Sequence, residues 1–300
     1  MRYDKWLSKN THSLSGKTVA ISGSTGGLGK HLCRYLAYLG ADIVLLDRNR
    51  SRSEANKRAI EEEFPGVNVS LVSLDLVDIF SVKAATDRLR EIEPDILIHN
   101  AGAYSIPRCI SNSCYDNVYT INFASPYYMI RELLPILVKK QGRAVVVGSI
   151  AHNYSKINEA DIDFSGVERA SLVYGNAKRF LMFSLYELFE SVSGATLSVT
   201  HPGITFTNIT AHYPKLIFAL IKHPMKVIFM RPEKAALSIV KGLFASTDYH
   251  EWYGPRIFDV WGLPSKKLLK TCKMSESERI AEISEDVYCS IKNTLSAKTE

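Results

Sequence analysis

Tyr174 and Lys178 are the residues whose types and spacing best fit acid–base chemistry. They are four residues apart in a predicted helix over 167–193, so both face the same side. A phenol has an ordinary pKa of about 10, too high for a base at neutral pH, and a nearby ammonium group favours its ionised form. Lowering that pKa by about 2–3 units requires roughly 3–4 kcal/mol, which charges in a partly dry cleft can supply. The pair predicts a proton donor and acceptor, although this spacing also occurs by accident.

Two further polar residues could complete such a site. Ser149 directly follows a predicted strand over 144–147, and Asn122 lies in a predicted helical region over 112–140. A hydroxyl at Ser149 could hold a substrate oxygen while the proton moves. Ser149 and Asn122 can act with Tyr174 and Lys178 only if the fold brings all four side chains to the same edge of a sheet.

A glycine-rich turn near the start of the chain indicates where this edge of the sheet lies. The apolar run 18–22 is followed by Gly23, Gly26, Gly27 and Gly29, and then by an apolar stripe at helical spacing. A strand, a glycine turn and a helix place a diphosphate against bare backbone N–H groups at the helix N-terminus. A turn that merely starts a helix would also explain these glycines.

Polar residues follow the other predicted strands as well. In an open parallel sheet the ligand lies beyond the carboxyl ends of the strands. Asp47 could accept both ribose hydroxyls of a dinucleotide and would repel a 2′-phosphate, whereas Arg48 could bind that phosphate. Asp47 is nearer the strand end, which favours NAD over NADP. Asp75-Leu76 could flank the adenine, and a turn with a side-chain amide follows at Asn100-Ala101-Gly102.

Apolar runs and helical patterns alternate along the chain, which predicts a doubly wound parallel sheet covered by helices on both faces. No linker or repeat divides residues 1–300, so we expect one domain. Residues 204–231 mix apolar side chains with lysines and are expected to cover the substrate. Residues 256–260 suggest a last edge strand, and residues 262–300 a C-terminal helical extension. The expected strands are 18–22, 42–46, 69–74, 95–99, 144–147 and 197–200.

Composition excludes several classes of protein. The apolar share is 46% and the net charge +6, with no basic run, which disfavours nucleic-acid binding. No apolar run reaches the roughly 18 residues of a membrane span, and residues 1–10 contain no secretory apolar core. The five cysteines form no Cys-x-x-Cys pair, so free thiols, a cytoplasmic location and no metal site are expected.

The motifs together resemble the short-chain dehydrogenase/reductase family, whose Rossmann-like fold the pattern fits. The resemblance covers roughly residues 14–203. It implies that Asn122, Ser149, Tyr174 and Lys178 form a catalytic tetrad. It also implies that Tyr174 is the general acid/base, that Lys178 holds the nicotinamide ribose and depresses the phenol pKa, and that Asn122 holds a water. The residues implied in cofactor binding are Gly23, Ser24, Thr25, Gly27, Leu28, Gly29, Asp47, Arg48, Asp75, Leu76, Asn100, Ala101, Gly102, Tyr174, Lys178, Pro202, Gly203 and Thr207.

Within the family the chain is similar to the retinol-dehydrogenase-like group. Ala151-His152, His201-Pro202-Gly203 and the long interval between Ser149 and Tyr174 carry this resemblance. It implies an oxidoreductase that moves hydride between NAD(H), or NADP(H), and an apolar secondary alcohol or ketone of hydroxysteroid or retinoid type. A homo-dimer or homo-tetramer is expected by resemblance only.

Two other interpretations remain open at this point. A dinucleotide-binding sensor or scaffold without turnover would need the same fold and the same glycine turn. A cationic, apolar stretch over 213–231 could also rest on a membrane surface without spanning it.

Overall fold

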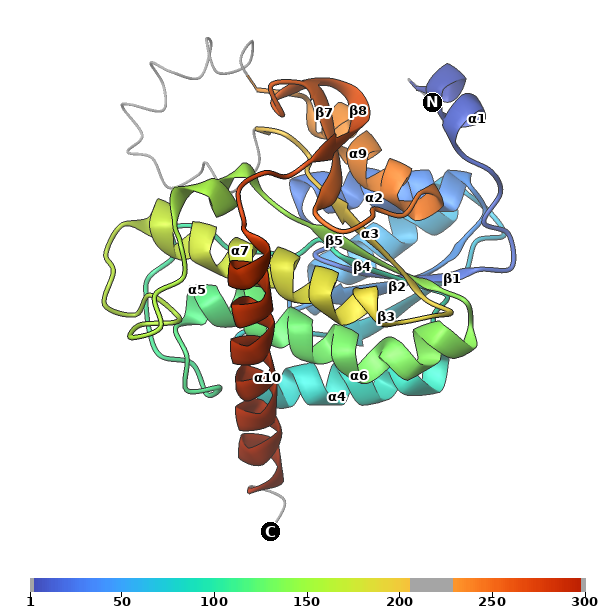
Figure 1. Ribbon diagram of the computed structural model, residues 1–300. Coiled ribbons are helices and arrows are strands. Elements are labelled where there is room, and N and C mark those ends of the chain that lie inside the picture. The colour runs from blue at the N-terminus through green and yellow to red at the C-terminus, as the bar shows by residue number, and fades with distance from the viewer. Residues whose placement is uncertain (1–2, 206–228, 298–300) are drawn as a thin grey trace, which may run out of the picture.

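An eight-stranded sheet forms the centre of the molecule (Figure 1). The computed structural model describes residues 3–205 and 229–297 of the chain. The strand order is β3-β2-β1-β4-β5-β6-β7-β8, and every neighbouring pair is parallel except β7 and β8. The strands are β1 (Thr18–Ser22), β2 (Asp42–Asp47), β3 (Val69–Ser73), β4 (Ile96–His99), β5 (Arg143–Val147), β6 (Thr196–Thr200), β7 (Glu251–Ile257) and β8 (Trp261–Leu268).

Side chains of the central strands alternate between two apolar cores. In β1, Val19 and Ile21 join the core beneath α2 and α9, whereas Ala20 joins the core on the opposite face. Both faces are therefore buried, which is why these strands read as continuous apolar runs in the sequence. The predicted doubly wound, Rossmann-like architecture is confirmed.

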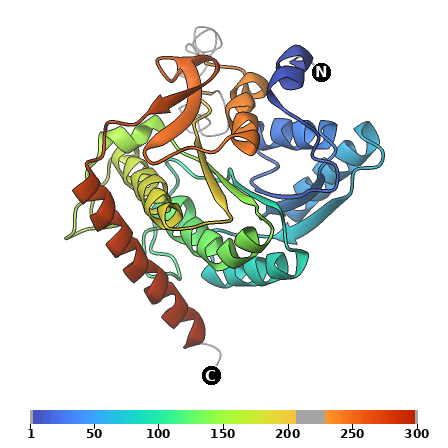
Figure 2. The ribbon, with the colours of Figure 1, turned by 45° about the vertical axis from the view of Figure 1, so that its right-hand side comes forward.

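Helices cover both faces of the sheet, as the two views in Figures 1 and 2 show. Side chains of α2, α3 and α9 pack on one face, and those of α4, α6, α7 and α10 belong to the core of the other. The helices are α1 (Asp4–Asn10), α2 (Gly27–Tyr38), α3 (Arg50–Glu63), α4 (Ile79–Ile92), α5 (Asn117–Tyr119), α6 (Ser125–Lys139), α7 (Ala170–Glu190), α9 (Pro232–Phe244) and α10 (Met274–Ser296), with a π-helical turn at Thr120–Ala124 and a 3₁₀ turn at Ile150–Tyr154.

The region after α9 differs from the sequence prediction. The helical extension expected from residue 262 begins only at Met274, because Trp261–Leu268 forms the antiparallel edge strand β8. Phe258 and Asp259 both have positive φ values, 50° and 58°, and so reverse the chain between β7 and β8. The edge strand expected over 256–260 is also misplaced, because β7 ends at Ile257 and residues 258–260 form the turn. Gly262 and Pro264 weaken the strand pattern of β8, so this strand was not expected. The predicted substrate cover over 204–231 lies mostly outside the described residues.

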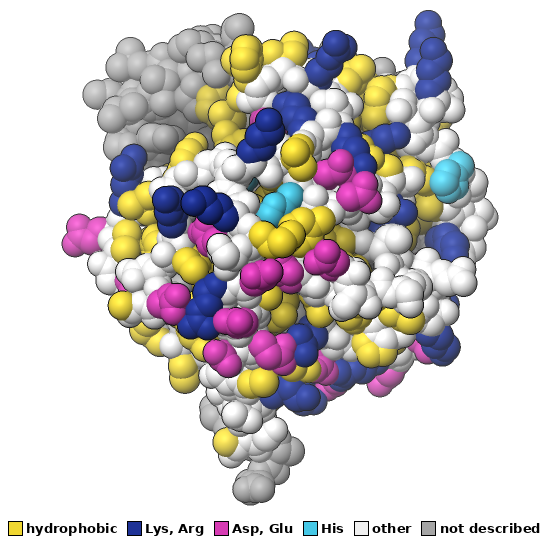
Figure 3. Space-filling model, in the orientation of Figure 1, with side chains coloured by type: hydrophobic (Ala, Val, Ile, Leu, Met, Phe, Trp, Pro, Cys, Tyr) yellow, Lys and Arg dark blue, Asp and Glu magenta, His cyan; other side chains and the backbone are white. Residues whose placement is uncertain are grey.

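Charged side chains of both signs are interspersed on the face seen in Figure 3. Among residues 3–205 and 229–297, no helix combines the length and the apolar character needed to cross a bilayer.

Candidate active site

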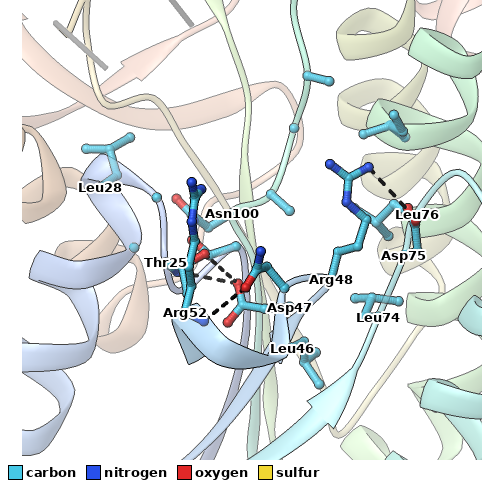
Figure 4. A pocket seen from close by; sticks show the side chains of 18 of the residues that line it. Thr25, Leu28, Leu46, Asp47, Arg48, Arg52, Leu74, Asp75, Leu76 and Asn100 are labelled. Atoms are coloured by element: carbon cyan, nitrogen blue, oxygen red, sulfur yellow. Dashed lines mark hydrogen bonds and ion pairs between the residues drawn. The ribbon is translucent and has the colours of Figure 1, made fainter. Parts of the chain in front are cut away.

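A pocket of about 410 Å³ lies beyond the carboxyl ends of β1, β2, β3 and β4. It is the place where an open parallel sheet receives a ligand. Figure 4 shows side chains from these strand ends and from α2 and α3 around it. We call it the dinucleotide pocket. It is lined by Gly23, Thr25, Gly26, Gly27, Leu28, Gly29, Leu46, Asp47, Arg48, Asn49, Arg52, Leu74, Asp75, Leu76, Asn100, Ala101, Gly102, Ala103 and Ile121.

The glycine turn leaves backbone N–H groups open at the start of α2. This helix begins at Gly27, and the capping position before it, Gly26, provides no side-chain cap. A Cβ on Gly29 would lie 2.1 Å from the carbonyl oxygen of Gly23, so only glycine allows the helix to begin this close to the strand. Bare amides at a helix N-terminus bind phosphate groups. The described residues therefore fit a diphosphate, and Gly23, Gly27 and Gly29 lie where the sequence indicates.

Asp47 lines the pocket, but its carboxylate is already bound by groups of the protein itself. Its side chain is buried, and its Oδ2 accepts hydrogen bonds from the hydroxyls of Ser24 and Ser53, the latter at 2.7 Å. Its Oδ1 lies 3.4 Å from both the amide N and the Oγ1 of Thr25. A carboxylate has about four acceptor positions, and these four donors occupy them. Asp47 thus stabilises the glycine turn, and Ser24 is a buried partner of Asp47 and does not line the pocket.

Two arginines border the same end of the pocket. Arg48 reaches toward Asp75, with 3.9 Å between its Nη1 and Oδ2 of the carboxylate, and its side chain is 74% exposed (Figure 4). Arg52, in the first turn of α3, is also exposed and lines the pocket. The sequence reasoning missed Arg52, because its place beside the pocket depends on where α3 begins and how the helix is oriented.

The turn after β4 connects the glycine turn to the polar residues of the other strand ends. The side-chain amide of Asn100 donates to the carbonyl oxygens of Ser22 and Gly23, both at 3.1 Å. The hydroxyl of Ser22 in turn accepts from the backbone amides of Asn100 and Ala101, both at 3.1 Å. Asn100 therefore fixes one wall of the dinucleotide pocket through main-chain contacts.

Tyr174, Lys178 and Ser149 are brought together at this wall. The hydroxyl of Ser149 lies close enough to the Tyr174 phenol to lower its pKa, and Lys178 Nζ lies 5.7 Å from the centre of the Tyr174 ring. Lys178 is buried and donates to the carbonyl oxygen of Val147 at 2.9 Å. A Cβ built on Gly102 would come within 3.7 Å of Lys178 Nζ. Because Gly102 lines the dinucleotide pocket, the lysine lies directly behind the pocket wall.

The pKa values of this pair move in the directions that burial dictates. Burial raises the pKa of Tyr174 to about 12, against a lowering by the Ser149 hydrogen bond. Burial lowers the pKa of Lys178 to about 7. The expected depression of the phenol pKa is thus absent from the protein alone, because a buried lysine that loses its own proton near neutrality offers little positive charge.

Asn122 is buried in the π-helical turn Thr120–Ala124. Its amide donates to the carbonyl oxygens of Ala103 and Val118, both at 2.8 Å, and its Oδ1 accepts from the Ala103 amide at 3.3 Å. A Cβ on Gly102 would lie 2.7 Å from that Oδ1. Asn122 and Lys178 therefore meet on either side of the same glycine.

The remaining predicted residues lie elsewhere or outside the description. Pro202 is buried, and Gly203 packs beside Pro255 and Val260 of the β7–β8 hairpin instead of lining the dinucleotide pocket. Thr207 lies outside the described residues.

Comparison with known proteins gives consistent matches. A family model described as short chain dehydrogenase matches residues 17–160. The chain is 30% identical over 214 residues to mouse retinol dehydrogenase 14, which covers 66% of this chain and 64% of that protein. It is 30% identical over 232 residues to bovine dehydrogenase/reductase SDR family member 13, covering 75% and 61%. The chain thus spans less than two thirds of the length of these two curated relatives.

Solved structures share the fold. A Mycobacterium paratuberculosis protein of uncharacterised function superimposes with a TM-score of 0.70 at 22% identity, covering 94% of each chain. L-Sorbose reductase from Gluconobacter frateurii, complexed with NADPH and L-sorbose, has a TM-score of 0.60 at 20% identity, covering 87% of this chain and 99% of that one.

Proposed function

We propose that this chain is a nicotinamide-dependent oxidoreductase of the short-chain dehydrogenase/reductase family, which its match to the family model and its similarity to retinol dehydrogenase 14 support. Its substrate is proposed to be an apolar secondary alcohol or ketone of hydroxysteroid or retinoid type. One observation carries the proposal. The side chains of Tyr174, Ser149 and Lys178 lie together against the wall of a pocket whose glycine turn fits a diphosphate.

The nicotinamide, when bound, supplies the hydride. The chain's own residues do the rest. Ser149 offers a hydroxyl to a substrate oxygen, and Tyr174 exchanges a proton with that oxygen. With its pKa raised to about 12, Tyr174 keeps its proton at neutral pH, and a protonated phenol is the form that donates to a carbonyl oxygen.

The hydrogen bonds around the dinucleotide pocket also change the expected preference between NAD(H) and NADP(H). The sequence argument for NAD rests on a free carboxylate at Asp47, but that carboxylate is already bound by hydroxyl and amide donors. Arg48 and Arg52, both exposed, offer guanidinium groups to a 2′-phosphate at the same end. We therefore favour NADP(H) over NAD(H).

A direct comparison of the two cofactors tests this choice. Replacing Arg52 by alanine should raise the KM for NADPH about tenfold, since a charge-assisted contact is lost, and leave the KM for NADH nearly unchanged. Arg58→Ala, an exposed arginine of the same helix outside the dinucleotide pocket, serves as the control. A KM for NADPH that is equal in both variants would return the preference to NAD.

Turnover is tested by following absorbance at 340 nm with NADH and NADPH over steroid, retinoid and sugar ketones and aldehydes. Tyr174→Phe should abolish turnover and leave the Kd for cofactor within about twofold, because the phenyl ring keeps its packing and loses only the exchangeable proton. Tyr38→Phe, the same change at an exposed tyrosine of α2, should leave both values unchanged. Cofactor binding without turnover over the whole panel would instead favour a sensor or scaffold.

The cytoplasmic location and the homo-oligomer stay predictions. The proposed membrane contact over 213–231 lies mostly outside the described residues, and a liposome flotation assay tests it directly.

A further inference from the structure

Arg179, the residue after Lys178, is a fully buried charge with an unusually complete set of partners. Its Nε and Nη2 donate to the two carboxylate oxygens of Glu276, at 2.8 and 2.7 Å. Its Nη1 donates to the carbonyl oxygen of His152 at 3.0 Å, and Nη2 donates also to that of Thr271 at 2.8 Å. A guanidinium fork suits such a bidentate arrangement, which a lysine cannot reproduce. Arg179 thus joins helix α7 to the first turn of α10 and to the chain just before it.

His152 contacts Thr271, which lies just before α10, and also contacts the backbone of Ser149. Its Nδ1 lies 2.6 Å from the carbonyl oxygen of Ser149, and its Nε2 lies 2.8 Å from Oγ1 of Thr271. Burial lowers the pKa of His152 to about 4, so the ring is neutral at physiological pH. A carbonyl can only accept, so Nδ1 carries the proton and Nε2 accepts from the threonine hydroxyl. The ring packs edge-on against Trp252 at 5.4 Å, which restricts its movement.

Two series of hydrogen bonds therefore connect the segment from Thr271 to Glu276 with the candidate active site. The first passes from Thr271 through His152 to the backbone of Ser149. The second passes from Glu276 to Arg179, which directly follows Lys178 on α7. We propose that the segment from Thr271 to Glu276 is a positioning element of the active site, which sets the orientation of Ser149 relative to Tyr174 and Lys178. This inference rests on the function proposed above.

The position of these contacts explains why they would affect chemistry. Ser149 begins the 3₁₀ turn Ile150–Tyr154, and its Oγ accepts from the Ala151 amide at 3.2 Å. A rotation of the Ser149 peptide would therefore move the same hydroxyl that lowers the pKa of Tyr174. His152 and Arg179 do not touch the dinucleotide pocket, so they are positioning residues, not catalytic ones.

The test uses three variants in the full-length protein. His152→Leu removes both ring contacts, and we expect kcat to fall about tenfold, with the Kd for cofactor unchanged. His152→Asn retains an amide donor near the position of Nδ1, and should recover kcat to within about threefold of the original protein. Glu276→Gln weakens the ion pair with Arg179, and should lower kcat and raise the apparent pKa of the kcat profile. Glu278→Gln, the same change at an exposed glutamate two residues further on, is the matched control.

The outcomes separate a positioning role from a structural one. If His152→Leu and Glu276→Gln melt earlier but keep the kcat, KM and apparent pKa of the Glu278→Gln control, the segment is only structural and the inference is wrong. Recovery of kcat in His152→Asn, together with a shifted pKa in Glu276→Gln, supports it.

Hydrogen exchange separates this inference from the function on which it rests. Amides of residues 149–154 should exchange faster in Glu276→Gln than in Glu278→Gln, whether or not the protein turns over a substrate. No turnover in the original protein would overturn the proposed function, and an unchanged exchange rate would overturn the coupling itself.

Discussion

Lys178 makes the folding stability of this protein depend on pH in a predictable way. Its ammonium group is buried, and burial lowers its pKa from 10.5 to about 7. Between these two values the unfolded chain binds a proton that the folded protein does not, so folding stability must rise with pH over this interval. Below pH 7 both states are protonated, and the effect of this residue levels off.

The magnitude follows from the two pKa values. Linkage gives a slope approaching about 1.4 kcal/mol per pH unit between them, and integration from pH 7 to pH 9 gives a gain of about 2 kcal/mol. Replacing Lys178 by methionine removes this titrating group and keeps an unbranched side chain of similar length. The difference in the free energy of unfolding between the original protein and Lys178→Met should therefore change by about 2 kcal/mol in favour of the lysine from pH 7 to pH 9.

Urea denaturation of the cofactor-free proteins at half-unit pH intervals from 6 to 9 measures this difference. All other titrating groups are shared by the two proteins and cancel in the comparison. A difference that stays constant over pH 7–9 would show that Lys178 remains charged in the folded protein. The argument that burial, and not a partner charge, controls this site would then be wrong.

Three further outcomes are expected. Gly29→Ala should abolish cofactor binding, measured by fluorescence titration, because its Cβ would lie 2.1 Å from the Gly23 carbonyl oxygen. Asp78→Ala should lower the free energy of unfolding in urea by about 1 kcal/mol, since the carboxylate caps α4 by accepting from the Phe80 amide. Titration with a thiol reagent should modify the exposed cysteines quickly, and the buried Cys33, whose pKa is raised by burial, only after unfolding. The fast-reacting thiols should be Cys109, Cys114 and Cys289.

The order of the central strands and of the turns after them could be predicted because apolar runs and glycine positions indicate the same elements. Apolar runs such as 18–22 are buried on both faces, and the glycines after them allow the close approach seen at Gly29. The edge strand β8 could not be predicted in this way, because half of its side chains face solvent and Pro264 interrupts its pattern. Its pairing with β7 depends on the hairpin turn at Phe258 and Asp259, not on the apolar content of the strand itself.

The sequence by itself determined the doubly wound fold, the glycine turn and the identity of the polar residues at the strand ends, since each depends on residue type and short-range spacing. Tertiary structure alone decided what those residues do electrostatically. Asp47 is occupied by hydroxyl donors from two other segments. Burial raises the pKa of Tyr174, opposite to the expected lowering, and lowers the pKa of Lys178. Contacts between distant segments, such as Arg179 with Glu276, leave no periodic trace in the sequence, because each partner is specified only by where the fold brings the other.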